Sequence, residues 1–108
     1  MSAENKYSRE FNPSDTVEYS DGAVVSKTII KKENGNLTLF SFDKGERLAE
    51  HTSPYDAFIH ILDGKAEVIL DKIIHNLSAG QSILLPANIP HSLRAVEKFK
   101  MMLIMIKS

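Results

Sequence analysis

Short apolar segments separated by turn residues recur along most of this chain, and they limit its fold more than any other feature. The segments are rich in β-branched residues or alternate between apolar and polar positions, at intervals of about ten residues. Asn34-Gly35, between two of them, is a strong signal for a β-hairpin turn. No window carries the apolar period of a long helix. The pattern predicts an all-β sandwich or barrel of about nine short strands.

The strand boundaries follow from the apolar runs and from the turn-forming residues between them. Asp71-Lys72 is expected to form a tight turn, and Pro86 is expected to end the strand that precedes it. The expected strands lie at residues 24–32, 37–42, two within 45–64, 66–70, 73–77, 82–85, 91–96 and 100–106.

The composition indicates one domain with no electrostatic attraction to nucleic acid or membranes. A chain of 108 residues has room for one core, which we expect at residues 23–108, with residues 1–22 as an N-terminal arm that is docked or partly flexible. The net charge is −1 and the basic residues are scattered. There is no cysteine, and the start lacks the apolar core of a signal peptide, so we expect a soluble cytoplasmic protein.

Residues 57–62 and 101–106 are apolar on both faces of their expected strands. A strand of an antiparallel barrel normally leaves one face in water, so double apolarity implies that the outer face is covered. Three candidates for this cover are the N-terminal arm, a second subunit and a second sheet of the same chain. We expect a homodimer.

The stretch from residue 45 to 64 combines a glycine, a histidine, a proline-marked loop and a closing glycine. Gly45, His51 and Gly64 have the spacing of the first glycine, the first histidine and the last glycine in the first sequence motif of the cupin superfamily, which this chain resembles. The resemblance implies an antiparallel double-stranded β-helix, or jelly-roll barrel, over residues 37–106.

A second motif supports the same resemblance. Gly80, Pro86 and His91 match its glycine, proline and histidine, and Asn88 stands where the family has a further glycine. Asparagine tolerates a left-handed backbone better than most residues, so the turn is expected to persist. The resemblance implies that His51 and His91 meet inside the barrel.

Two of the four metal-ligand positions that the resemblance implies are lost. Ser53 stands at the second histidine of the first motif and Ala57 at its glutamate, and neither is a good ligand for a divalent transition metal. Asp56, next to the lost glutamate, is one replacement candidate. His60 is another, but strand alternation directs it away from Ala57 unless a bulge intervenes.

Two functions remain open at this stage. The first is a module that binds a small molecule in an interior pocket. The second is a metal-dependent enzyme, an oxygenase or isomerase, that holds Fe, Mn, Ni or Zn and acts on a small chelating substrate. A plainer alternative is that the two histidines are relics, each satisfied by a backbone partner. The expected ligand-binding residues are Phe40, His51, Ser53, Tyr55, Ala57, Ile59 and His91.

Overall fold

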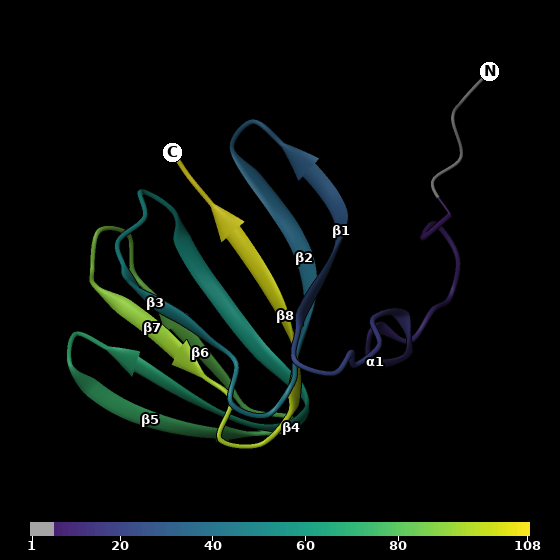
Figure 1. Ribbon diagram of the computed structural model, residues 1–108. Helices are drawn as coiled ribbons and strands as arrows, with labels where there is room; N and C mark the ends of the chain where they lie inside the picture. Colours follow the sequence, from purple (N-terminus) through teal and green to yellow (C-terminus); the bar gives the residue numbers. More distant parts are fainter. Residues whose placement is uncertain (1–5) are drawn as a thin grey trace.

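Eight antiparallel strands form one curled sheet in the computed structural model, which describes residues 6–108 (Figure 1). The elements are α1 (Pro13–Thr16), β1 (Val24–Lys32), β2 (Gly35–Phe42), β3 (Arg47–His51), β4 (Asp56–Leu70), β5 (Ile73–Ser78), β6 (Ser82–Leu85), β7 (His91–Arg94) and β8 (Phe99–Ile106). Neighbouring strands follow the order β1-β2-β8-β4-β7-β3, and β5 and β6 both pair with β4. The strands converge at one end and splay at the other (Figure 1). The predicted all-β antiparallel barrel is confirmed.

The longest strand, β4, replaces two of the nine strands expected from the sequence. It runs from Asp56 to Leu70 without the expected break at Gly64. Its first part pairs with β6 and β8, and its second part pairs with β5 and β7. A register shift between Ile61 and Asp63 and a φ of +77° at Gly64 bend the strand without ending it. The expected number of strands is therefore wrong by one. Gly64 bends a single strand so that it passes from one region of the sheet to another, and the chain does not reverse there.

Left-handed turns occur where the sequence predicts them. Asp71 and Lys72 have φ values of +49° and +68°, as a two-residue hairpin turn requires, and Asn88 has a φ of +66°. Both expectations are confirmed.

The first hairpin turns one residue earlier than its Asn-Gly signal predicts. Lys32 pairs with Gly35, so the turn residues are Glu33 and Asn34, and Gly35 begins β2. A Cβ on Gly35 would lie 2.8 Å from the Met105 carbonyl oxygen. The glycine therefore allows β8 to approach closely at this point.

Alternation along β4 separates a buried face from an outer face. Ala57, Ile59 and Ile61 are at most 5% exposed, whereas Phe58 is 37% exposed, in agreement with the expected alternation. The Phe42 and Phe99 rings stack inside the barrel with centroids 4.5 Å apart. The remaining buried residues of this core are Ala66, Val68, Leu77, Leu85, Leu93, Ala95 and Met101.

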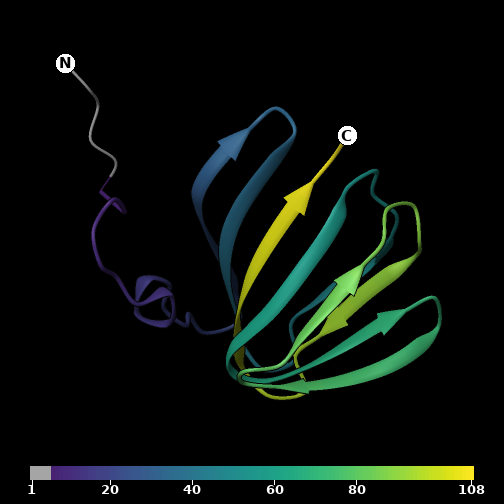
Figure 2. The ribbon, with the colours of Figure 1, turned by 180° about the vertical axis from the view of Figure 1, so that it is seen from behind.

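The segment before β1 lies against the sheet, with α1 beside β4 and β8 (Figures 1 and 2). Val17 is fully buried, and the Ser41 hydroxyl donates to the Glu18 carbonyl oxygen at 2.7 Å. The Tyr19 hydroxyl donates to Asp63 Oδ2 at 2.5 Å, and burial together with this hydrogen bond raises the pKa of Tyr19. Residues 1–5 of the expected arm lie outside the described residues.

This segment covers only part of the outer face. Leu39 on β2 is fully buried, but Phe58 on β4 and Ile106 on β8 remain 37% and 61% exposed. Within residues 6–108, no helix has the length and apolar content that a membrane crossing requires.

Gly64→Ala tests the bend in β4. A Cβ at this residue would overlap the Lys98 carbonyl oxygen and lie 2.9 Å from Phe99 Cα. We expect a loss of about 2–5 kcal/mol in the free energy of unfolding, measured by urea titration, from the left-handed backbone and the overlap together. Gly45→Ala is the matched control, since Gly45 has a φ of +89° but nothing within 4 Å of its Cβ position, and it should cost only about 1–2 kcal/mol. Equal losses in the two variants would contradict this account of the bend.

Candidate functional site

The pairing of β3 with β7 brings two histidines together. His51 is the register partner of His91, and their rings meet edge to face with centroids 4.4 Å apart. His91 is 8% exposed and His51 is exposed. The pair therefore joins the interior of the barrel to its surface.

A bulge in β3 is what directs His51 inward. Leu48 pairs with Leu93, and His51 pairs with His91, so three steps on β3 match two steps on β7. In a regular strand Leu48 and His51 would face opposite sides of the sheet. The extra residue places both on the inner face.

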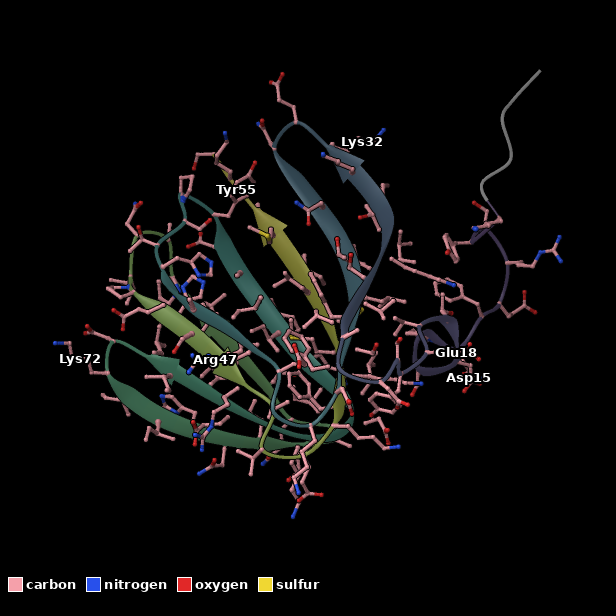
Figure 3. All side chains as sticks on the ribbon, in the orientation of Figure 1. Asp15, Glu18, Lys32, Arg47, Tyr55 and Lys72 are labelled. Atoms are coloured by element: carbon pink, nitrogen blue, oxygen red, sulfur yellow. The ribbon has the colours of Figure 1, made fainter. Side chains whose placement is uncertain are left out.

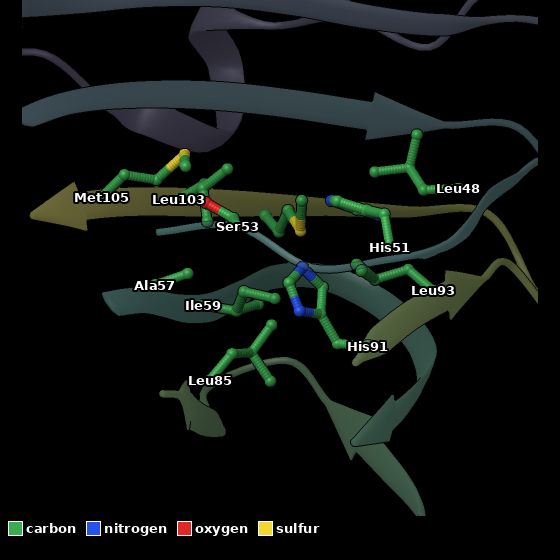
Figure 4. Close-up of a pocket in the computed structure, with 11 residues that line it drawn as sticks. Leu48, His51, Ser53, Ala57, Ile59, Leu85, His91, Leu93, Leu103 and Met105 are labelled. Carbon is green, nitrogen blue, oxygen red and sulfur yellow. The ribbon is translucent and has the colours of Figure 1, made fainter. Parts of the chain in front are cut away.

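A cavity of about 70 Å³ lies beside the two rings (Figure 4). Both imidazoles project into it between β8 and β4 (Figure 4). The volume is about half that of an engineered apolar cavity of roughly 150 Å³ that binds benzene. Only a few ligand atoms therefore fit inside. The lining residues are Leu48, His51, Ser53, Ala57, Ile59, Leu85, His91, Leu93, Met101, Leu103 and Met105.

Local backbone contacts set the tautomer of both rings. Nδ1 of His51 lies 2.9 Å from the Ala49 carbonyl oxygen, and Nδ1 of His91 lies 3.1 Å from the Ile89 carbonyl oxygen. A carbonyl oxygen only accepts hydrogen bonds, so each Nδ1 carries a proton and donates it. In the neutral rings Nε2 then bears a lone pair, which accepts a hydrogen bond or binds a metal ion.

The backbone contacts account for one nitrogen of each ring. If the two histidines had no function, each would be expected to have a backbone partner, and Nδ1 of each ring has one. These bonds leave each Nε2 as a second polar atom, directed at a cavity with mostly apolar walls. The same bonds also orient the rings, as backbone carbonyls do for histidines that bind metals.

Three further predicted residues line the cavity. Ser53, Ala57 and Ile59 all contribute to its wall. The Ser53 hydroxyl oxygen accepts a hydrogen bond from the Tyr55 backbone N–H at 3.1 Å, which fixes its position. The two residues that replace the family's ligands therefore face the cavity.

Phe40 and Tyr55, also predicted as ligand-binding residues, lie outside the cavity lining. Phe40 is the register partner of Met101 but sits on β2, one strand farther from β7, with its ring 6.1 Å from that of Phe42. Tyr55 lies at the splayed end of the barrel (Figure 3). The Lys107 ammonium is 5.3 Å from its ring centroid.

Asp56 and His60, the candidates for a replacement metal ligand, also lie away from the cavity. Asp56 Oδ1 accepts a hydrogen bond from the Ala87 backbone N–H at 2.8 Å. His60 Nδ1 lies 2.7 Å from the Ser82 hydroxyl, on the face opposite Ala57. The bulge that would turn His60 inward does not form, since the β4 register shift comes later, between Ile61 and Asp63.

The residues present do not fit a resident metal ion. Within residues 6–108, no group of three His, Asp or Glu side chains is arranged to hold one. His51 and His91 supply two donors, whereas protein metal sites of this type use three or four. Ser53 and Ala57 occupy the positions where further ligands are expected from the family motif.

Six residues of the wall are not among the ligand-binding residues expected from the sequence, namely Leu48, Leu85, Leu93, Met101, Leu103 and Met105. Met101, Leu103 and Met105 alternate along β8 and pair with Ile61, Ile59 and Ala57 respectively. The sequence signal was their period of two, which places all three on one face. Leu48 is brought in by the β3 bulge, which no residue pattern marks.

Known proteins are similar in sequence to part of this chain. Protein SchB of Streptomyces halstedii is 33% identical over 73 residues, which are 67% of this chain and 53% of SchB. Polyketide synthase CurC of Streptomyces cyaneus is 34% identical over 64 residues, 58% of this chain and 42% of CurC. The chain thus spans about half the length of these curated relatives.

A solved structure matches over the entire chain. The conserved SPY1581 protein of Streptococcus pyogenes, a protein of unknown function, is 35% identical with a TM-score of 0.92, covering 100% of this chain and 96% of that one. A model of the cupin domain matches residues 38–107, which include all of β3 to β8 and both histidines. The chain therefore belongs to the cupin domain family.

Proposed function

We propose that this cupin binds a small, partly apolar molecule in the barrel, with His51 and His91 as its polar anchors. One observation carries the proposal: two imidazoles from different strands direct Nε2 into a cavity whose other walls are almost entirely apolar. Such a cavity with a few convergent polar groups is the usual form of a small-molecule site.

The size and walls of the cavity limit the ligand. About 70 Å³ holds only part of a drug-sized molecule, so one end enters and the remainder lies at the opening beside the exposed His51. Apolar burial there contributes roughly 25 cal/mol per Å² of surface removed from water. The polyketide synthase name of the CurC relative is compatible with a ligand that is apolar and carries oxygen atoms.

The alternative is a metal-dependent oxygenase or isomerase. Its support is the orientation of both Nε2 atoms, which is the one that metal-binding histidines adopt. A metal bound by this pair alone would need its other ligands from substrate or water. Because the described side chains do not complete a metal site, we favour binding without a resident metal.

We also propose a second copy of this chain as the cover of the outer face. Five apolar residues stand in register across β6, β4, β8, β2 and β1, namely Leu84, Phe58, Ile104, Leu37 and Ile30. The N-terminal segment covers only part of this side of the sheet. An apolar sheet face packs well against another sheet face, and a two-fold axis would place the same row on each side of the interface.

The pocket is tested by thermal unfolding with a library of small uncharged molecules. A ligand present at 100 times its Kd should stabilise the protein by about 2.7 kcal/mol. We expect this stabilisation to be lost in His91→Ala and kept in His75→Ala, since His75 lies on β5 outside the cavity lining. A library with no stabilising member, or hits that do not depend on His51 or His91, would refute the proposed function.

Metal content separates the two functions. After exposure to Fe, Mn, Ni or Zn and gel filtration, we expect far less than one metal per wild-type chain, measured by elemental analysis. Ser53→His combined with Ala57→Glu should raise it toward one, because both residues line the cavity. Phe58→Glu alone is the control, since Phe58 faces outward and the cavity then keeps only its two histidine donors. Near-stoichiometric metal in wild type that disappears in His51→Ala and His91→Ala would favour the enzyme.

The dimer is tested by light scattering at micromolar concentration. We expect a two-chain mass for wild type and a one-chain mass for Leu84→Lys, because a charge in the apolar row would be buried without a partner. Ile74→Lys is the matched control. Ile74 is 57% exposed against 56% for Leu84, but it lies on β5, away from the row. A one-chain mass for wild type would exclude the dimer.

A further inference from the structure

We propose that the pocket selects neutral ligands that present a hydroxyl group, such as phenols and enols, over carboxylates and over ligands that only accept hydrogen bonds. The inference rests on the proposed binding function and specifies the ligand class. It follows from the direction in which hydrogen bonds run in the pocket.

The histidines supply the acceptors. Each Nδ1–H is already donated to a backbone carbonyl, from His51 to Ala49 and from His91 to Ile89. Neutral imidazole has no second N–H, so a ligand meets two lone pairs at Nε2. The oxygen of a ketone, ether or carboxylate placed there would bring its lone pairs against those of the imidazoles, and the two would repel. A hydroxyl group can instead donate its hydrogen bond to Nε2 of either ring.

Ser53 supplies the complementary donor. Its oxygen accepts the Tyr55 backbone N–H at 3.1 Å, and the hydroxyl proton is the donor that this side chain offers. The lining thus contains two acceptors and one hydroxyl donor. A ligand hydroxyl has one proton to give and lone pairs to receive one, so its hydrogen bonds can all be made in the pocket.

The absence of charged side chains from the described cavity lining favours an uncharged ligand. No Asp, Glu, Lys or Arg is among the described residues that form the wall. An ammonium group entering the cavity would lose its hydration without gaining an opposite charge, and a carboxylate would gain one only by protonating a histidine ring. The neutral hydroxyl is the donor whose burial costs least here.

The size of the cavity indicates how such a ligand sits. About 70 Å³ admits the hydroxyl and the adjoining edge of a ring or chain. Met101 and Met105 form part of the wall, and their flexible thioether side chains adapt to the shape of that edge and pack well against an aromatic ring. The rest of the ligand would extend past His51 toward solvent.

The test compares three probes that share one ring: phenol, anisole and benzoate, titrated into metal-free protein and followed by NMR chemical shifts of the pocket methyl groups. We expect phenol to bind and anisole to bind on the order of tenfold more weakly, the usual effect of one unmade hydrogen bond to a buried acceptor. Benzoate should bind more weakly still. His91→Phe should remove the preference for phenol over anisole, and the control His75→Phe should keep it.

The outcomes separate this inference from the function on which it rests. Binding of benzoate or anisole as tight as that of phenol, with dependence on His51 and His91, would overturn the selectivity and leave the binding function standing. No binding of any probe would overturn both. Long-range ¹H–¹⁵N spectra of the wild-type protein need no variant, so they test the premise even if His91→Phe fails to fold. A proton on Nε2 of either ring in the neutral state would overturn the inference.

Discussion

The antiparallel pairing of β3 with β7 is the interaction on which the pocket depends. It sets His51 opposite His91 although the two lie far apart in the chain. The pairing works only because β3 carries one extra residue between Leu48 and His51, which turns the imidazole inward. Backbone carbonyls two residues before each histidine then hold the rings. Strand register fixes where the rings are, and the local bonds fix which nitrogen faces the cavity.

The bend in β4 lets one strand serve both sheet regions. Before Gly64 the strand supplies Ala57 and Ile59 to the pocket wall, and after it the strand pairs with β7, which carries His91. The same first half places Phe58 in the apolar row on the outer face. Pocket and outer face are thus two sides of one strand, so a change of register in β4 would exchange their residues.

Motif spacing and strand alternation predicted much of this arrangement. The spacing of Gly45, His51, Gly80 and His91 indicated the barrel, and alternation placed Ala57 and Ile59 inward with His60 outward. The errors have a common physical origin. The continuous β4, the inward Leu48 and the position of the first hairpin turn all depend on bulges or close backbone approaches, which are set by pairing with distant strands. Phe40 points to the inner side of the sheet, as Met101 opposite it does, but it lies on β2 and outside the cavity lining.

The two lost ligand positions change what the remaining histidines favour. In a site with a carboxylate and a third imidazole, the Nε2 lone pairs would be complemented by a cation. With Ser53 and Ala57 in those places, the cavity has lone pairs but no negative charge to balance a metal ion. The hydrogen bonds to Ala49 and Ile89 hold the rings in the orientation suited to a metal, independently of whether one binds. An oriented pair of acceptors in an apolar wall is best complemented by a neutral donor, and this complementarity is the physical basis of the proposed preference for hydroxyl ligands.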